Sequence, residues 1–161
     1  MHLRKFDDIV AHSPSARLRR RALAVMVTLG LLGVGQTVLA ATGKTDLTVY
    51  QDPNCGCCTG WVEHMRASGF TVTAILTSDV VSHKARLGVP PALGSCHTAV
   101  VHATGQVIEG HVPANAVRKM LINPSVKGVA APGMPTNAPG MGALNGNLIT
   151  VDFNGKPFSR D

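Results

Sequence analysis

The chain has 161 residues and a net charge of +6, but residues 41–161 carry only +2, because nine Lys or Arg there face seven Asp or Glu. The excess positive charge therefore lies in the first forty residues. No basic stripe interleaved with aromatic residues remains in residues 41–161, which argues against nucleic-acid binding.

The first forty residues have the pattern of an export signal. Arginines precede an apolar run at residues 22–35, and Val38-Leu39-Ala40 provides the small or apolar residues that a signal peptidase reads. A membrane anchor needs about 20 continuous apolar residues, whereas three glycines interrupt this run. We therefore expect residues 1–40 to be a signal peptide cleaved after Ala40, with a twin-arginine export route left open. Residues 41–161 are then expected to form one periplasmic domain without stable membrane insertion.

Residues 47–87 are predicted to form two strands and two helices. Apolar residues at i, i+3, i+4 and i+7 indicate a helix beginning at the cysteines, and Gly69 is a plausible C-terminal cap. The turn signal Asp52-Pro53-Asn54 precedes this helix. The predicted elements are a strand at 47–50, a helix with Cys58, Trp61, Val62 and Met65 on one face, a strand at 70–76, and a short helix ending at Leu87 with Ser78 or Asp79 as its N-cap.

The rest of the chain is predicted to contain a hairpin, a helix and a final strand. Residues 98–101 and 106–109 flank a turn with a glycine, which is typical of a β-hairpin. Val117 and Leu121 have helical spacing within a helix at 113–122. A stretch rich in Gly, Pro, Ala and Asn follows at 125–147, and we expect the last strand at 148–153.

This order of elements is that of the thioredoxin fold. We therefore predict an α/β fold with a thioredoxin-like central sheet flanked by helices and a Gly/Pro-rich C-terminal extension. In that fold a Cys-x-x-Cys pair lies at the N-terminus of the first helix, where the helix dipole favours the thiolate. Cys55-Gly56-Cys57-Cys58 occupies that place, and the loop at 94–98 would bring Cys96 next to it.

Converging thiols of this kind are suited to a soft metal ion. Zinc sites usually use two well-spaced Cys-x-x-Cys pairs, a layout that this chain lacks. Crowded cysteines better suit thiolates that bridge more than one copper(I) ion, and a methionine thioether also prefers copper(I). His111 and Met141 are weaker candidates. The predicted metal ligands are Cys55, Cys57, Cys58, Cys96, His97 and Met134, with copper(I) as the metal and zinc as the alternative.

Two other functions remain open. Cys55 and Cys58 have the spacing of a periplasmic thiol–disulfide oxidoreductase, although Cys57 and Cys96 offer competing disulfides that would trap such an enzyme. An even cysteine count also fits an interaction domain held by two structural disulfides. The sequence carries no recognisable Ser–His–carboxylate arrangement or phosphate loop, so a hydrolase has little support.

The ordered motifs resemble those of the CopG-type copper-resistance proteins, a group long described only as a metal-binding domain. The resemblance covers residues 46–153, nearly all of the expected mature chain. The motifs that carry it are Asp52-Pro53-Asn54-Cys55-Gly56-Cys57-Cys58, Gly60-Trp61-Val62-Glu63-His64, Leu87-Gly88-Val89-Pro90, Ser95-Cys96-His97-Thr98, Ile108-Glu109-Gly110-His111-Val112-Pro113-Ala114 and Pro132-Gly133-Met134-Pro135.

The resemblance implies a periplasmic, thioredoxin-like protein of copper tolerance. Such a protein would hold copper through cysteine-bridged coordination, with conversion between copper oxidation states as a further expected activity. Its partners would be copper ions and other periplasmic copper-handling proteins. The matching thiols are Cys55, Cys57, Cys58 and Cys96, and His97 is the matching neighbour. The chain departs from the family pattern at residues 136–142.

Overall fold

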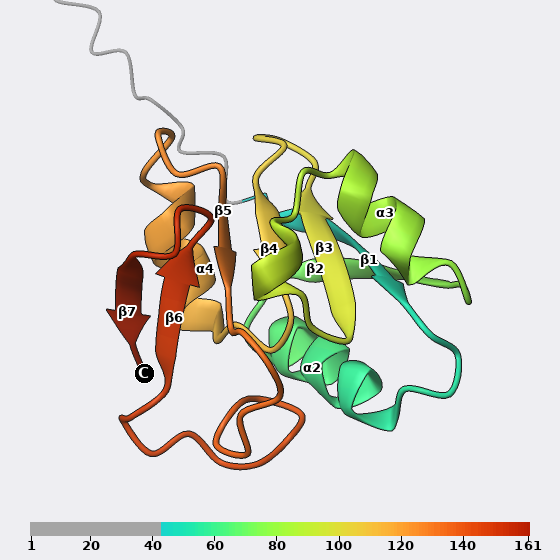
Figure 1. Ribbon diagram of the computed structural model, residues 1–161. Helices are drawn as coiled ribbons and strands as arrows, with labels where there is room; N and C mark the ends of the chain where they lie inside the picture. The colour runs from blue at the N-terminus through green and yellow to red at the C-terminus, as the bar shows by residue number, and fades with distance from the viewer. Residues whose placement is uncertain (1–42) are drawn as a thin grey trace, which may run out of the picture. The chain divides into compact units, whose positions relative to one another are not determined.

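A seven-stranded sheet forms the centre of the computed structural model, which describes residues 43–161 (Figure 1). The predicted signal peptide lies outside the described residues. The strand order is β2-β1-β3-β4-β5-β6-β7, with β1 parallel to β2 and β3 antiparallel to both β1 and β4. The strands are β1 (Asp46–Gln51), β2 (Thr71–Leu76), β3 (His97–Val101), β4 (Val107–Glu109), β5 (Gly128–Ala130), β6 (Ile149–Asp152) and β7 (Pro157–Arg160).

Helices cover both faces of the sheet (Figure 1). They are α2 (Gly56–Ala67), α3 (Val80–Arg86), α4 (Ala114–Leu121) and the short 3-10 helix η1 (Pro91–Leu93). Helices α2 and α4 share one hydrophobic core with the sheet, formed around Trp61, Met65, Ile108, Val117 and Met120. None of the helices in residues 43–161 is long and apolar enough to cross a membrane.

Helix α3 packs on the opposite face of the sheet. Side chains alternate between the two faces of a strand, so Glu109 points away from the core to which its neighbour Ile108 belongs. Lys84 of α3 bonds to Glu109 on that face. The N-terminus of α3 is capped by Asp79, whose side chain accepts a hydrogen bond from the Ser82 backbone N–H at 3.2 Å.

The predicted α/β fold, with a central sheet flanked by helices, is confirmed. Two strands were not predicted. β5 has only three residues and lies in the Gly/Pro-rich stretch, where it pairs with β4 and β6. The expectation that the strand at 148–153 ends the fold is wrong, because β7 follows it as an edge strand. β7 begins with a proline, which is tolerated at the first residue of an edge strand but weakens the sequence signal.

Candidate metal centre

Three of the four cysteines lie at the beginning of α2. The turn after β1 is held by Asp52, whose backbone carbonyl accepts from the Cys55 N–H at 3.1 Å and whose side chain accepts from the Asn54 N–H at 2.8 Å. Cys55 is thereby the N-cap residue, and Cys57 and Cys58 lie in the first turn. The positive end of the helix dipole favours negatively charged thiolates at this position.

The fourth cysteine reaches the same place from the strand beside β1. Cys96 directly precedes β3, and the first residue of β3, His97, pairs with Gln51 at the end of β1. The four cysteine Sγ atoms lie within 4.8 Å of one another. The structure therefore brings together the four cysteines that the sequence predicts to converge, and their role as metal ligands stays a prediction.

Two of these cysteines form a disulfide. Cys55 is bonded to Cys58, whereas Cys57 and Cys96 are free thiols. The Cys57 Sγ lies 3.5 Å from the Cys55 Sγ, close enough to attack the disulfide. A disulfide sulfur is a far weaker metal ligand than a thiolate, so the number of thiolates available rises from two to four when this bond is reduced.

A second group of donors shares Cys96. The His111 Nε2 lies 3.0 Å from the Cys96 Sγ, and the His111 Nδ1 lies 2.7 Å from the Pro139 carbonyl oxygen. A carbonyl can only accept, so Nδ1 carries the proton and Nε2 presents a lone pair to the sulfur. Neutral imidazole held in this way is a common metal ligand.

The side chain of His97, the residue after Cys96, is fully buried. Its Nδ1 lies 3.6 Å from the Cys96 Sγ, and its ring packs against Trp61 with centroids 4.6 Å apart. Its Nε2 has no hydrogen-bond partner among the described residues. Burial, followed by repulsion from His111 and Lys84, holds the pKa of His97 well below its ordinary value of 6.5, so the ring is neutral.

The Cys96 thiol is protonated in the absence of metal. Burial, reinforced by repulsion from Cys57, raises the pKa of Cys96 to about 11. Burial also lowers the pKa of His111, although its hydrogen bond to Pro139 opposes the shift. A neutral thiol therefore faces a neutral imidazole, and a metal ion that binds here must displace the thiol proton.

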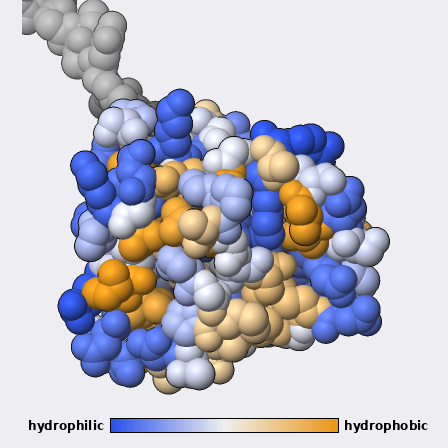
Figure 2. Space-filling view, viewed as in Figure 1, coloured by the Kyte–Doolittle hydropathy of each residue, from blue (hydrophilic) through white to orange (hydrophobic). Residues whose placement is uncertain are grey.

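The Gly/Pro-rich segment packs against the start of α2. A Cβ atom on Gly140, whose φ is +83°, would overlap the Cys57 carbonyl oxygen and lie 2.6 Å from the Trp61 backbone nitrogen. Only glycine permits this approach. In the region of α2 and this segment the surface has a weakly apolar area with hydrophilic residues on either side of it (Figure 2).

Met134, the predicted thioether ligand, lies in the same segment. The Ser95 hydroxyl, beside Cys96, donates to the Gly133 carbonyl at 2.8 Å, which keeps the backbone of this segment next to the cysteine loop. The Met134 side chain is 53% exposed. Its part in metal binding stays a prediction.

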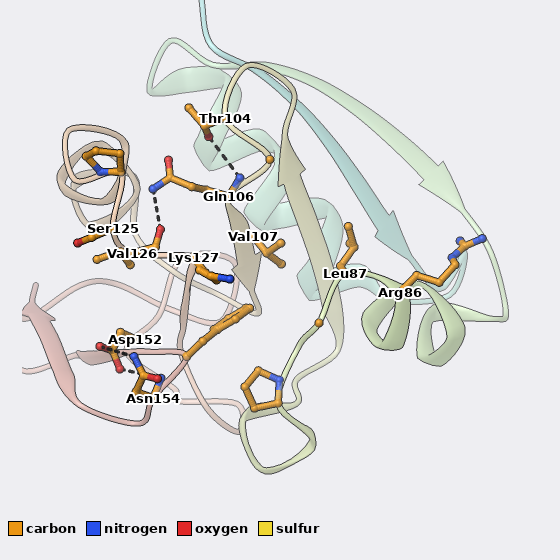
Figure 3. Close-up of a pocket in the computed structure, with 15 residues that line it drawn as sticks. Arg86, Leu87, Thr104, Gln106, Val107, Ser125, Val126, Lys127, Asp152 and Asn154 are labelled. Carbon is orange, nitrogen blue, oxygen red and sulfur yellow. Dashed lines mark hydrogen bonds between the residues drawn. The ribbon is translucent and has the colours of Figure 1, made fainter.

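A groove of about 880 Å³ lies away from the cysteines, between the end of α3 and the β5–β6 region (Figure 3). Arg86, Leu87, Gln106, Lys127 and Asp152 are among its lining residues, which include no cysteine or histidine. The groove therefore offers no soft metal ligand.

Comparisons with known proteins agree with this description. A family model described as a protein of unknown function, DUF411, matches residues 93–141. The chain has no significant match among curated protein sequences. Two solved structures of the copper resistance protein CopG, Form 2 and Form 1, are each 36% identical to this chain with a TM-score of 0.65. Each match covers 74% of this chain, and 99% of the Form 2 chain or 98% of the Form 1 chain.

The chain belongs to the CopG family. The predicted resemblance to CopG-type copper-resistance proteins is thus confirmed. The DUF411 match includes Cys96, His97 and His111 but begins after the cysteines of α2. The CopG-family chain therefore draws its candidate centre from two parts of the sequence that the fold places together.

In the sequence of this CopG-family member His111 is a weaker candidate than His97, and the structure places its Nε2 3.0 Å from the Cys96 Sγ. Its place after the hairpin indicated the correct end of the sheet, but no spacing rule predicts that Pro139 fixes its ring. The side chain is fully buried, and buried polar groups usually have partners. The signal that could have found it is a lone histidine beside a glycine and a proline, in the motif Gly110-His111-Val112-Pro113.

Proposed function

We propose that this protein binds copper(I) in a cysteine thiolate cluster and serves copper tolerance in the periplasm. The observation that carries the proposal is the convergence of four cysteine sulfurs within 4.8 Å. Soft thiolate ligands select copper(I) among the common metals. The solved relatives are named copper resistance proteins, which supports copper as the cargo.

The donor set fits copper(I) better than a single zinc ion. A structural zinc site needs four ligands that each reach one ion in a tetrahedral arrangement. Here Cys57 and Cys58 are adjacent in sequence on one helical turn, and the imidazole of His111 adds a donor beside Cys96. We propose that the thiolates bridge more than one copper(I) ion, with zinc as the competing metal.

The Cys55–Cys58 disulfide adds a redox capacity to this site. When the disulfide is reduced by two copper(I) ions, each ion loses one electron and becomes copper(II). The sulfur–sulfur bond takes both electrons and, with two protons, becomes two thiols. We propose that the protein interconverts copper oxidation states in this way and exchanges copper with other periplasmic copper-handling proteins.

Thiol–disulfide exchange is the second candidate function. It is favoured by the disulfide at the N-terminus of α2, the place that it would occupy in a thioredoxin-like enzyme. Such an enzyme would use Cys55 and Cys58 and would need no metal. Cys57, 3.5 Å from Cys55, is positioned to rearrange that disulfide, which argues against simple dithiol turnover.

Metal and thiol content of anaerobically purified protein separates the two functions. The protein is produced in copper-supplemented cells as the parent and as the Cys57→Ser, Cys96→Ser and Cys55→Ser variants. We expect more than one copper ion per parent chain and loss of copper in the first two variants. Metal-free parent protein that reduces a disulfide substrate, with activity abolished by Cys55→Ser alone, would replace the copper proposal with the second function.

A further inference from the structure

The loop that carries Cys96 is held by a buried ion pair from the opposite face of the sheet. Glu109 at the end of β4 is completely buried, and Lys84 of α3 is 15% exposed. The Lys84 Nζ donates to the Glu109 Oε1. A buried ion pair is costly to desolvate and so is weak evidence of stability by itself. Its other contacts indicate a more specific role.

Both members of the pair bond to backbone groups that flank Cys96. The Ser95 backbone N–H donates to the Glu109 Oε1 at 2.6 Å. The Lys84 Nζ donates to the His97 carbonyl oxygen at 3.0 Å. The residue before Cys96 and the residue after it are therefore each fixed by one charged side chain, and hydrogen bonds to charged groups are stronger than those between neutral groups.

We propose that Lys84 and Glu109 are positioning residues for the Cys96 thiol, a role that rests on the proposed function of the cysteine cluster. Neither side chain contacts a sulfur in the described structure. Instead, the pair fixes the backbone on both sides of Cys96, and this keeps the Cys96 Sγ among the other three sulfurs and next to His111. A site whose ligands are held in place before metal arrives binds more tightly, because less freedom is lost on binding.

Two double variants separate the effect of the hydrogen bonds to the backbone beside Cys96 from the effect of the two charges. Lys84→Met with Glu109→Met removes both charges and both backbone contacts. Lys84→Met with Glu109→Gln removes the same charges, but the Gln carbonyl oxygen can still accept from the Ser95 N–H. The matched control, Lys156→Met with Glu63→Gln, makes similar replacements at two exposed positions.

The first measurement needs no copper. The metal-free protein with its Cys55–Cys58 disulfide is treated with iodoacetamide, and alkylation of Cys96 and Cys57 is followed by peptide mass spectrometry. The Met/Met variant loses two backbone hydrogen bonds, so we expect Cys96 to react faster by at least the roughly two- to tenfold that corresponds to one of them, with a smaller increase in the Met/Gln variant. Cys57, on α2, should react at the parent rate.

The second measurement is the copper(I) dissociation constant of the reduced proteins, by competition with a chromogenic chelator. We expect weaker binding in the order parent, Met/Gln, Met/Met, with the control equal to the parent. Unchanged Cys96 alkylation in Met/Met, or equal acceleration of Cys57 and Cys96, overturns the positioning role. If the parent binds no copper(I) while Cys96 alone accelerates, the proposed function fails and the positioning role stands.

Discussion

The His111 Nε2 lies 3.0 Å from the Cys96 Sγ, and the Pro139 carbonyl fixes the orientation of that imidazole from its other side. The two residues are fifteen positions apart, but Cys96 directly precedes β3 and His111 follows β4, so both lie at the open end of the β3–β4 hairpin. Because Nδ1 donates to the carbonyl, the lone pair on Nε2 points to the sulfur. We therefore predict that His111 acts as a metal ligand or as the hydrogen-bond partner that orients one.

His111→Ala is expected to weaken copper(I) binding without removing the thiolate cluster. Loss of a group that orients a metal ligand typically costs 10- to 100-fold in metal affinity, so we expect a decrease of about that size in a chelator competition assay. His83→Ala is the control, because His83 stacks on Tyr50 and makes no contact with a cysteine in the described residues. Equal affinities of the parent and His111→Ala would exclude a role for His111.

Gly140→Ala is expected to destabilise the protein by about 1–3 kcal/mol, because backbone strain adds to the overlap with α2. Gly146→Ala is a matched control, since Gly146 also has a positive φ of +79° but a Cβ there would meet nothing within 4 Å. Urea denaturation of the two variants measures the difference. Equal destabilisation would mean that the contact between residue 140 and α2 contributes nothing beyond backbone strain.

The stability of the metal-free protein is expected to fall below neutral pH in a way that depends on His64. The His64 Nε2 accepts from the Ala114 backbone N–H, the first residue of α4, at 3.2 Å and is therefore unprotonated. Burial lowers the pKa of His64 from 6.5. Below pH 6.5 the unfolded chain binds a proton that the folded chain does not, so the free energy of unfolding falls as the pH falls.

Urea denaturation at about pH 7.5 and about pH 5.5 checks this dependence in the parent and in His64→Gln. The variant can still accept from Ala114 but cannot titrate, so it should lose less stability than the parent. The difference should be smaller than the roughly 1.4 kcal/mol per pH unit of one whole proton, because His64 is only half-buried. Identical losses in both proteins would contradict the prediction.

Copper capacity is expected to depend on the state of the Cys55–Cys58 disulfide. Anaerobic copper(I) titration of the reduced protein should reach a higher copper-to-protein ratio than titration of the oxidised protein, because reduction doubles the number of thiols. A Cys55→Ser/Cys58→Ser variant should behave like the oxidised protein under either condition. The disulfide of the oxidised parent is checked after titration by mass spectrometry, because copper(I) can itself reduce it. Equal capacities of the reduced parent and of an oxidised parent whose disulfide is still intact would show that Cys55 and Cys58 are not ligands.

Much of the fold and the convergence of the cysteines could be predicted from the sequence. Helical spacing placed Cys58 on the first turn of a helix, and the order of elements placed Cys96 beside it. These signals are local or periodic. The approach of His111 to Cys96 depends instead on a turn, and on a carbonyl 28 residues further along the chain. The periodic spacing of apolar residues, which indicates helices and strands, gives no sign of such a contact.

The Lys84–Glu109 pair was missed for a related reason. A glutamate between Ile108 and Gly110 appears in the sequence as the exposed end of a hairpin strand, and a lysine on a short helix appears as a solvent-exposed charge. Their pairing depends on the packing of α3 on β3 and β1, from which the Lys84 side chain reaches Glu109 of β4, and the sequence does not specify this packing locally. The short strand β5 was likewise hidden, because its three residues pair only through neighbours distant in sequence.

The central claim is that copper(I) is held by the clustered thiolates, and X-ray absorption at the copper edge tests it most directly. The reduced protein is loaded with copper(I) anaerobically and compared with its Cys57→Ser and Cys96→Ser variants. We predict copper(I) with a first coordination shell dominated by sulfur, neighbouring copper ions at short range, and loss of copper–copper scattering in both variants. A shell of nitrogen and oxygen alone, or a spectrum unchanged by both substitutions, would contradict the claim.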